Sequence, residues 1–246
     1  MGSQQNRLSD SSGRPALRRA SEQITDPSAV YDDAPAHTLL AKHAALSYPY
    51  TCKFGEAVLE IDEGVFCPTL THASPLLLSA VDFRPAERML DAFAGSGAFG
   101  INAALRGAQA VLFDTSPLAV QCASRNAKLN QVEQYVDVRA GDMRHCLQDG
   151  EQFDLIVANP PLLPGEPSDA ITTAIYDPQL QATVDFIHLL PKHLAPQGRC
   201  YLLTSDVSDR FGLDIAQLCA QQGLVSGVSE KTDLSYESYR VHKITW

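Results

Sequence analysis

An asparagine followed by two prolines carries the strongest chemical signal in this sequence. Asn159, Pro160 and Pro161 follow directly after an apolar run that ends at Ala158. A proline holds the residue before it extended, and the second proline stiffens the turn. The side-chain oxygen of Asn159 and the carbonyl of Pro160 then become two fixed hydrogen-bond acceptors. Two acceptors suit an NH2 group, because they direct its lone pair away from themselves and toward an electrophile. We therefore predict that Asn159 and Pro160 are catalytic.

A glycine-rich turn earlier in the chain predicts where a cofactor binds. Residues 91–100 read Asp-Ala-Phe-Ala-Gly-Ser-Gly-Ala-Phe-Gly, and glycines let the backbone turn sharply and approach a ligand closely. A dinucleotide would place its pyrophosphate at this turn, where a nearby carboxylate would repel it. Asp91 is instead placed to accept from the ammonium of a methionine moiety, which favours S-adenosylmethionine (SAM). The predicted cofactor contacts in this turn are Asp91, Phe93, Ala94, Gly95 and Gly97.

Two further acidic positions predict the rest of a nucleoside site. Asp114, followed by Thr115, ends the next apolar run, where a carboxylate can accept both hydroxyls of an adenosine ribose. This position serves a nicotinamide cofactor as well as SAM. Asp142 can accept the adenine amino group and Met143 can cover the ring, although Gly-Asp at 141–142 also fits an ordinary turn. We predict all four side chains as cofactor contacts.

A repeated pattern of strand, turn and helix positions these residues. Short apolar runs predict strands at 88–92, 110–114, 136–138, 153–158, 199–204 and 224–228. Helices are expected at 98–106, 116–130, 178–193 and 210–221. The segment 239–246 alternates as an antiparallel edge strand would. Strands that alternate with helices indicate an α/β fold with a doubly wound, mostly parallel sheet.

The chain before this pattern predicts a division into three parts. Residues 1–28 are polar and are expected to form a disordered segment or a lid. Residues 29–84 form an N-terminal helical and hairpin extension, and residues 85–246 form the SAM-binding catalytic domain. Within the extension we expect a helix at 34–46, strands at 57–61 and 64–66, and a helix capped by Ser74.

The composition narrows the class of protein. The formal net charge is −10 over 246 residues, and a protein that neutralises phosphates usually carries a basic face. Six cysteines include no C-x-x-C pair, so we expect neither a metal site nor a disulfide framework. No apolar run is long enough for a membrane span. These features predict a cytoplasmic protein that binds no membrane and no metal, and for which nucleic acid is an unlikely substrate.

Taken together, the motifs resemble those of class I SAM-dependent methyltransferases. Within that fold they are similar to the small-domain group with an Asn-Pro-Pro motif, which modifies nitrogens of adenine, guanine or glutamine. The resemblance covers about residues 57–246. It rests on the 91–97 turn, Asp114, Asp142 and Asn159-Pro160-Pro161 in this order. It implies a Rossmann-like sheet of seven strands and SAM as cofactor.

One position departs from the pattern of that group. The group usually has an aromatic residue after the two prolines, to stack on a planar acceptor, whereas this chain has Leu162. Tyr176 is expected to supply a ring from the following loop. We predict Pro161, Leu162 and Tyr176 as substrate contacts, with Tyr176 also catalytic. With the acidic charge, Leu162 favours a small aliphatic amine over a nucleobase.

Three reactions remain open from the sequence. The main prediction is N-methyl transfer to a small-molecule or amino-acid-derived amine. The chain is also similar to azetidine-2-carboxylate synthases, which implies an intramolecular cyclisation of SAM with release of methylthioadenosine. The third is methylation of a nitrogen in RNA or in a protein glutamine, as the bulk of the group does.

Overall fold

The computed structural model describes residues 31–246, so the predicted lid or disordered segment at 1–28 lies outside the described residues. The strands are β1 (Tyr50–Phe54), β2 (Ala57–Ile61), β3 (Arg88–Ala92), β4 (Gln109–Asp114), β5 (Val136–Ala140), β6 (Phe153–Ala158), β7 (Leu194–Ser205), β8 (Val225–Asp233) and β9 (Ser238–Thr245). The α-helices are α2 (Ala34–Ala44), α3 (Ala73–Ala80), α4 (Ala98–Leu105), α5 (Pro117–Leu129), α6 (Met143–Cys146), α7 (Gln181–His193), α8 (Asp206–Arg210) and α9 (Ile215–Gln221). Short 3-10 turns occur at Pro68–Leu70, Glu133–Tyr135, Thr172–Ala174 and Pro178–Leu180.

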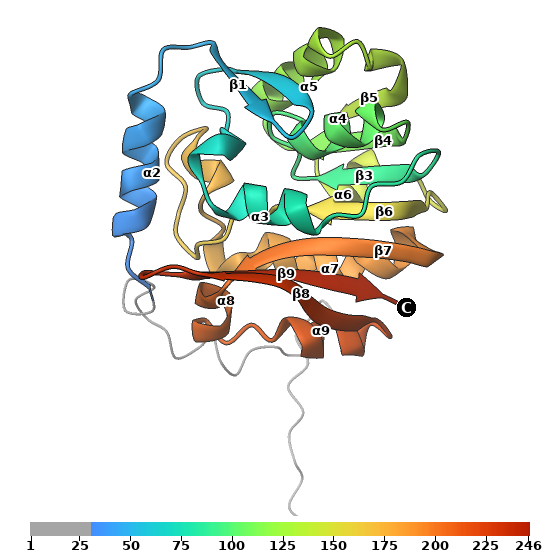
Figure 1. Cartoon of the computed structure of the whole chain (residues 1–246). Helices are drawn as coiled ribbons and strands as arrows, with labels where there is room; N and C mark the ends of the chain where they lie inside the picture. Colours follow the sequence, from blue (N-terminus) through green and yellow to red (C-terminus); the bar gives the residue numbers. More distant parts are fainter. Residues whose placement is uncertain (1–30) are drawn as a thin grey trace, which may run out of the picture.

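Seven of the strands form one sheet in the order β5-β4-β3-β6-β7-β9-β8 (Figure 1). The first five of these strands are parallel, and β9 runs antiparallel to both β7 and β8. This confirms the prediction of a doubly wound, seven-stranded, mostly parallel sheet. The segment 239–246 was expected at an edge, but β9 lies between its two neighbours, and β8 is the edge strand.

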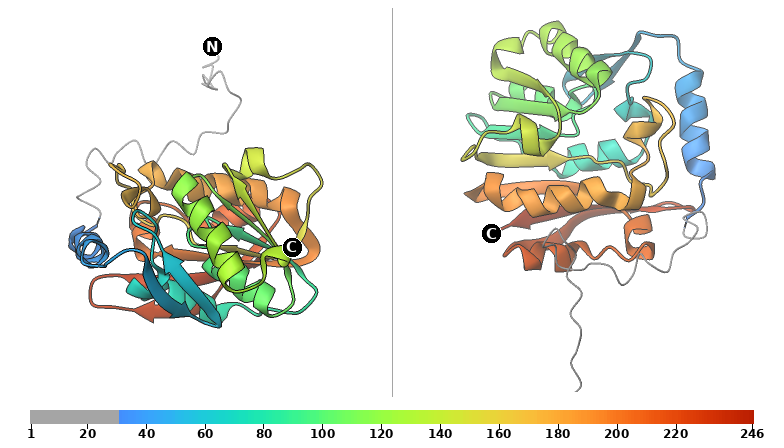
Figure 2. Two further views of the ribbon diagram at one scale, coloured as in Figure 1. Left: turned by 90° about the horizontal axis from the view of Figure 1, so that it is seen from above. Right: turned by 180° about the vertical axis from the view of Figure 1, so that it is seen from behind.

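Alternate residues of the central strands enter two separate cores. Leu155 and Val157 of β6 pack on the face covered by α3, α4 and α5. Ile156 and Ala158 pack on the opposite face against α7 and α9, and Figure 2 shows helices on both sides of the sheet. A strand that is buried on both faces needs apolar residues at every position. The continuous apolar run at 155–158 follows from this requirement, and the exposed Asp154 lies outside it.

The N-terminal hairpin differs from its predicted form. The strand at 57–61 pairs with β1, not with 64–66, where the structure has no strand. Gly55, with a φ of +61°, makes the tight turn between the two strands, as a residue without a Cβ does readily. Ser74 was expected to cap α3 but lies inside this helix. Its amide donates to Thr71 Oγ1 over 3.3 Å, so Thr71 supplies the side-chain oxygen near the helix start.

Asn126 of α5 and Asn130, which caps the C-terminal end of this helix, attach the hairpin to α5. Asn126 and Asn130 lie one helical turn apart and face the free edge of β2. Asn126 Oδ1 accepts from the Glu60 amide over 2.8 Å, and its Nδ2 donates to the Glu60 carbonyl over 3.1 Å. Asn130 makes the same pair of hydrogen bonds with Val58, at 2.9 and 2.7 Å. The side chains therefore supply the hydrogen bonds that a neighbouring strand would make.

The extension shares its core with the sheet. Phe54 and Leu59 of the hairpin pack in one cluster with Phe99 and Ile101 of α4. The domain boundary after residue 84 stays a prediction. Further along, one helix was expected at 210–221, but Gly212, with a φ of +83°, separates α8 from α9. Among residues 31–246, no helix is both long and apolar enough to cross a membrane.

Candidate functional site

The carboxyl ends of β3, β4 and β6 meet at one edge of the sheet and bring the predicted motifs together. A cavity of about 90 Å³ opens there. It is lined by the glycine turn, by the residues after β4 and by the Asn-Pro-Pro segment. Of the predicted site residues, those that line it are Phe93, Ala94, Gly95, Asp114, Thr115, Asn159 and Pro161.

Asp114 is fixed at the rim of this cavity by backbone amides. Its Oδ2 accepts from the Gly95 amide over 2.8 Å, and its Oδ1 accepts from the Ser116 amide over 2.9 Å. Burial raises the pKa of the carboxyl, against the lowering effect of these amides. Gly95 has a φ of +53°, and a Cβ built on it would meet no atom within 4 Å. The turn thus leaves its backbone open to the approach of a ligand.

Asp91 lies behind the turn and not in the cavity. It is 1% exposed, and its Oδ2 accepts from the Gly100 amide over 2.8 Å, at the first turn of α4. Burial raises the pKa of Asp91 to about 8. Gly97 also has a structural position, because a Cβ there would crowd Leu112 and Ala123. The predicted contact of Asp91 with the ammonium of SAM is therefore not supported by this geometry.

Asp142 and Met143 also lie outside both cavities described here. Asp142 caps α6, where its Oδ1 accepts from the Arg144 amide over 2.8 Å. Met143 is buried in the core on the α7 face, beside Phe113. The sequence does not separate a helix cap from an adenine contact, because an acid after a glycine fits both, and the adenine contact stays a prediction.

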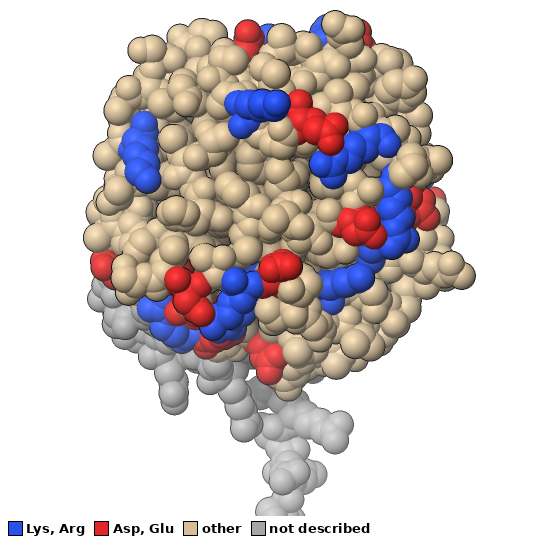
Figure 3. Space-filling view, viewed as in Figure 1, with Lys and Arg blue, Asp and Glu red and all other residues tan. Residues whose placement is uncertain are grey.

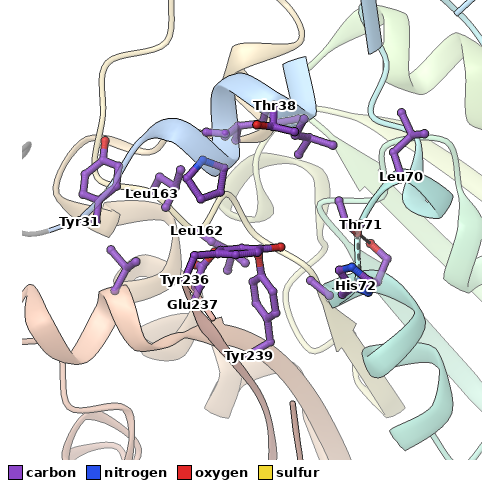
Figure 4. Close-up of a pocket in the computed structure, with 18 of the residues that line it drawn as sticks. Tyr31, Thr38, Leu70, Thr71, His72, Leu162, Leu163, Tyr236, Glu237 and Tyr239 are labelled. Carbon is purple, nitrogen blue, oxygen red and sulfur yellow. Dashed lines mark hydrogen bonds between the residues drawn. The ribbon is translucent and has the colours of Figure 1, made fainter. Parts of the chain in front are cut away.

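A second and larger cavity, of about 520 Å³, lies beside the first (Figure 4). Its walls come from α2, the 70–74 segment, the loop after Asn159 and the segment between β8 and β9. Leu162, predicted as a substrate contact, and Pro160, predicted as catalytic, line this cavity. Asn159 lines both cavities, together with Phe66 and Ala174.

A buried serine holds the amide of Asn159. The Nδ2 of Asn159 donates to Ser74 Oγ over 3.4 Å, and Ser74 is fully buried. This bond uses the NH2 end of the side chain. The Oδ1 end is then the one available as an acceptor for a further group, which is the role predicted for it.

Tyr176 lines neither cavity. Its hydroxyl donates to Asp33 Oδ1 over 2.8 Å, next to α2, and burial raises its pKa. Its ring packs against Gly165, where a Cβ would come within 2.6 Å of the ring. Tyr176 therefore ties the loop after Asn159 to the segment before α2. This placement does not support the predicted catalytic and substrate-binding roles.

Sequence reasoning missed the far wall of the larger cavity. Tyr236, Glu237 and Tyr239 line it from the C-terminal end of the chain, and Thr38 and Leu39 line it from α2. They lie far along the chain from the Asn-Pro-Pro motif, and no local motif marks them. Only the antiparallel return of β9 beside β7 brings them to this edge of the sheet.

A comparison with protein families identifies the fold as an enzyme fold. Residues 56–208 match the model of the methyltransferase small domain. The chain belongs to this family. It is a SAM-dependent methyltransferase-fold enzyme, as the resemblance implied. Among the described residues, no group of three or more His, Cys, Asp or Glu side chains is placed to hold a metal ion.

Curated relatives of the methyltransferase small domain match a part of this chain. A ribosomal protein L11 methyltransferase from Desulfitobacterium hafniense is 40% identical over 107 residues, which are 42% of this chain and 34% of that protein. A tRNA (uracil(54)-C(5))-methyltransferase from Pyrococcus horikoshii is 33% identical over 112 residues, which are 45% of this chain and 26% of that protein. The chain therefore spans about a third or less of the length of these relatives.

Solved structures show the same fold. A 16S rRNA methyltransferase from T. thermophilus, in complex with AdoMet and guanosine, superposes with a TM-score of 0.59 at 22% identity, over 80% of this chain and 49% of that one. A ribosomal protein L11 methylase from Lactobacillus delbrueckii subsp. bulgaricus gives a TM-score of 0.55 at 19% identity, over 76% and 86%. These likenesses establish the class I methyltransferase sheet.

The comparisons overturn the predicted partners. We expected a small-molecule substrate and considered nucleic acid unlikely, but the relatives are named for ribosomal protein L11, tRNA and 16S rRNA. Both expectations are wrong. The physical reason is that net charge sums over the whole chain and does not describe one binding face.

Proposed function

We propose that this chain is a SAM-dependent N-methyltransferase that methylates a primary amine of a protein, on a lysine side chain or at an N-terminus. One observation carries the proposal: Asn159 lines both cavities. A donor in the smaller cavity and an acceptor in the larger one would meet at this residue. A side chain between two cavities is suited to orienting one reactant against the other.

The edge of the sheet around the smaller cavity is proposed to hold SAM, of which a cavity of about 90 Å³ encloses only a part. The carboxylate of Asp114 has lone pairs left after its two amide bonds, and these suit the ribose hydroxyls. Gly95 leaves room for the methionine part, with Phe93, Ala94 and Thr115 around it. SAM supplies an electrophilic methyl group on a sulfonium. The contribution of the chain is to bind it in one orientation.

The larger cavity is proposed to present the amine. Asn159 Oδ1 and the Pro160 carbonyl would accept the two N–H groups and direct the nitrogen lone pair toward the smaller cavity. A lysine amine has a pKa of about 10.4 in water, and transfer into a partly apolar cavity lowers this value. Alignment of the two reactants can contribute roughly 7–11 kcal/mol to the rate. No charged base is needed for this geometry.

Three observations support a protein amine as the acceptor. Leu162 offers an aliphatic wall that suits the methylene chain of lysine. Figure 3 shows Lys and Arg interspersed with Asp and Glu on one face, and each arginine of residues 31–246 lies within 4.0 Å of a carboxylate oxygen. The relatives that are named for ribosomal protein L11 act on a protein.

The test is methyl transfer to separated ribosomal components. The chain is incubated with methyl-labelled SAM and with either ribosomal protein or ribosomal RNA, and S-adenosylhomocysteine and labelled product are measured by mass spectrometry. Label on protein amines, lost in Asn159→Ala, is the expected result. Label in RNA would replace the protein by RNA as substrate. Methylthioadenosine formed from SAM alone would overturn methyl transfer.

A further inference from the structure

The larger cavity has a polar wall that the methyl-transfer step does not use. It is formed by Tyr236 and Glu237, which precede β9, and by Tyr239 within β9 (Figure 4). These residues lie about 75 positions after Asn159 in the sequence. The wall combines one carboxylate with two aromatic rings.

The carboxylate of Glu237 is only half satisfied. Its Oε2 accepts from the Tyr239 hydroxyl over 2.7 Å. Its Oε1 is buried and makes no hydrogen bond with any described residue. A buried acceptor without a donor costs free energy, and a ligand that brings a donor recovers this cost. Burial raises the pKa of Glu237, and the nearby hydroxyls of Tyr239 and Ser205 lower it less.

The surroundings of Glu237 indicate the sign of the missing ligand. Arg210 also lines the cavity and its charge lowers the pKa of Glu237, but Arg210 Nη2 is paired with Asp206 Oδ1 over 3.2 Å. Asp206 itself adds negative charge at Glu237. The rim of the cavity carries Asp32 and Lys42, of opposite sign. Aromatic faces attract cations through their ring quadrupole, so the two tyrosine rings, like the carboxylate, favour a cationic ligand.

We propose that Tyr236, Glu237 and Tyr239 form a subsite that binds the ammonium group of a second lysine side chain of the acceptor protein, apart from the neutral amine that is methylated. The proposal rests on the proposed function in one respect, that the larger cavity receives the acceptor. The ammonium donates to the free Oε1 of Glu237 and lies against the tyrosine rings. The subsite selects a cationic side chain over an uncharged one of the same shape.

Two small probes test this selection without a known substrate. Nα-acetyl-lysine methylamide and Nα-acetyl-norleucine methylamide have the same aliphatic chain, and only the first carries a charge. Binding to the full chain is measured by NMR titration with S-adenosylhomocysteine present. We expect the lysine probe to bind about tenfold more tightly, as a charge-assisted hydrogen bond provides. Equal affinity of the two probes would overturn the proposal.

Two variants test whether Glu237 causes the preference for the lysine probe. Glu237→Gln removes the charge and keeps the shape, and we expect it to abolish the tenfold preference. Glu230→Gln on β8 makes the same change at an exposed position outside the cavity, and it should keep the preference. Circular dichroism and affinity for S-adenosylhomocysteine confirm that both variants are folded. A preference for the lysine probe that survives in Glu237→Gln would refute the subsite. The subsite would also be refuted if Glu237→Gln weakened the binding of guanosine but not that of the lysine probe.

The outcomes separate this proposal from the proposed function. Selective binding of the lysine probe without methyl transfer to any protein would leave the subsite standing and reject the function. Methyl transfer to a protein at the same kcat/KM in wild type and Glu237→Gln would support the function and reject the subsite.

Discussion

Carboxylates at the amino ends of the parallel strands and carboxylates at their carboxyl ends have opposite electrostatic environments. At the amino end, Glu151 precedes β6 and is ion-paired with Arg88 and Arg139, and the hydrogen bond with Arg139 is the main cause that lowers its pKa to about 2. At the carboxyl end, Asp91 and Asp114 accept only from backbone amides, and burial raises the pKa of both. The carboxylate of Glu151 is thus paired with cations, whereas those of Asp91 and Asp114 are not.

This difference separates the structural end of the molecule from the functional one. Paired charges satisfy themselves and stabilise the fold whether or not a ligand is present. A buried carboxylate without a cation is costly, and such groups concentrate where a ligand binds. Both cavities lie at the carboxyl end, as they do in other open α/β sheets. Substitutions at the two ends should therefore change different properties.

The largest effect is expected for Asn159→Ala at the carboxyl end. Loss of the acceptor that orients the amine should reduce kcat about 100-fold, by analogy with the loss of one oriented hydrogen-bonding group. Affinity for SAM should change by less than about threefold, since other residues are proposed to hold it. S-adenosylhomocysteine release and calorimetry measure the two quantities. Asn130→Ala, at the C-terminal end of α5, is the control, and equal turnover in Asn159→Ala would reject the site.

At the amino end, Glu151→Gln should lower the free energy of unfolding by about 2 kcal/mol. Two arginines lose their charged partner, and the partly buried Arg139 is left without full compensation. Turnover at saturating SAM should stay within about twofold of wild type. Urea unfolding and S-adenosylhomocysteine release check both values. A loss of activity without a loss of stability would contradict the division between the two ends.

Asp114→Asn should weaken SAM binding about tenfold, because a neutral amide accepts more weakly from the ribose hydroxyls and from the Gly95 amide. The KM for the acceptor should change little. Calorimetric titration with SAM gives the affinity. Asp142→Asn is the matched comparison, since Asp142 lies outside both cavities, and it should leave SAM affinity unchanged. Equal weakening of SAM binding in both variants would show that Asp142 contributes to the cofactor site.

The dependence of stability on pH gives the smallest effect, about 1 kcal/mol per pH unit. The folded-state pKa of Glu151 is depressed from 4.5 to about 2, so its contribution is present above pH 4.5 and is lost as the pH falls toward 2. The folded-state pKa of Asp91 is raised from 3.8 to about 8, so stability falls as the pH rises between these values.

Unfolding at pH 3 to 8 should show both slopes. Glu151→Gln should flatten the acid side, and Asp91→Asn should flatten the side from pH 4 to 8. An unchanged slope above pH 4 in Asp91→Asn would show that this carboxyl is ionised in the folded state.

The sequence was most informative where a strand ends in a motif. The strands at 88–92 and 153–158 were predicted within a residue, because they are short apolar runs bounded by turns. Asp114 and Asn159 were predicted at one edge, because parallel strands end at the same edge. These residues depend on local sequence and on one topological rule.

The sequence was least informative where a side chain had two possible directions. Asp91 turned toward the first turn of α4, and Tyr176 turned toward Asp33. Asp142 capped a helix. Each of these side chains can form its hydrogen bonds either with the observed partner or with a ligand, and only tertiary packing decides between the two. Glu237 could not be found in this way, because the position of β9 in the sheet brings it to the cavity.

The pairing of Asn126 and Asn130 with β2 has a consequence for self-association. An open strand edge is a template on which another chain can add a strand. Here a helix closes that edge with two side-chain amides, which copy the hydrogen-bonding pattern of a peptide. Leucine at both positions would keep the helix and reopen the edge. The asparagines thus protect the hairpin from β-type aggregation.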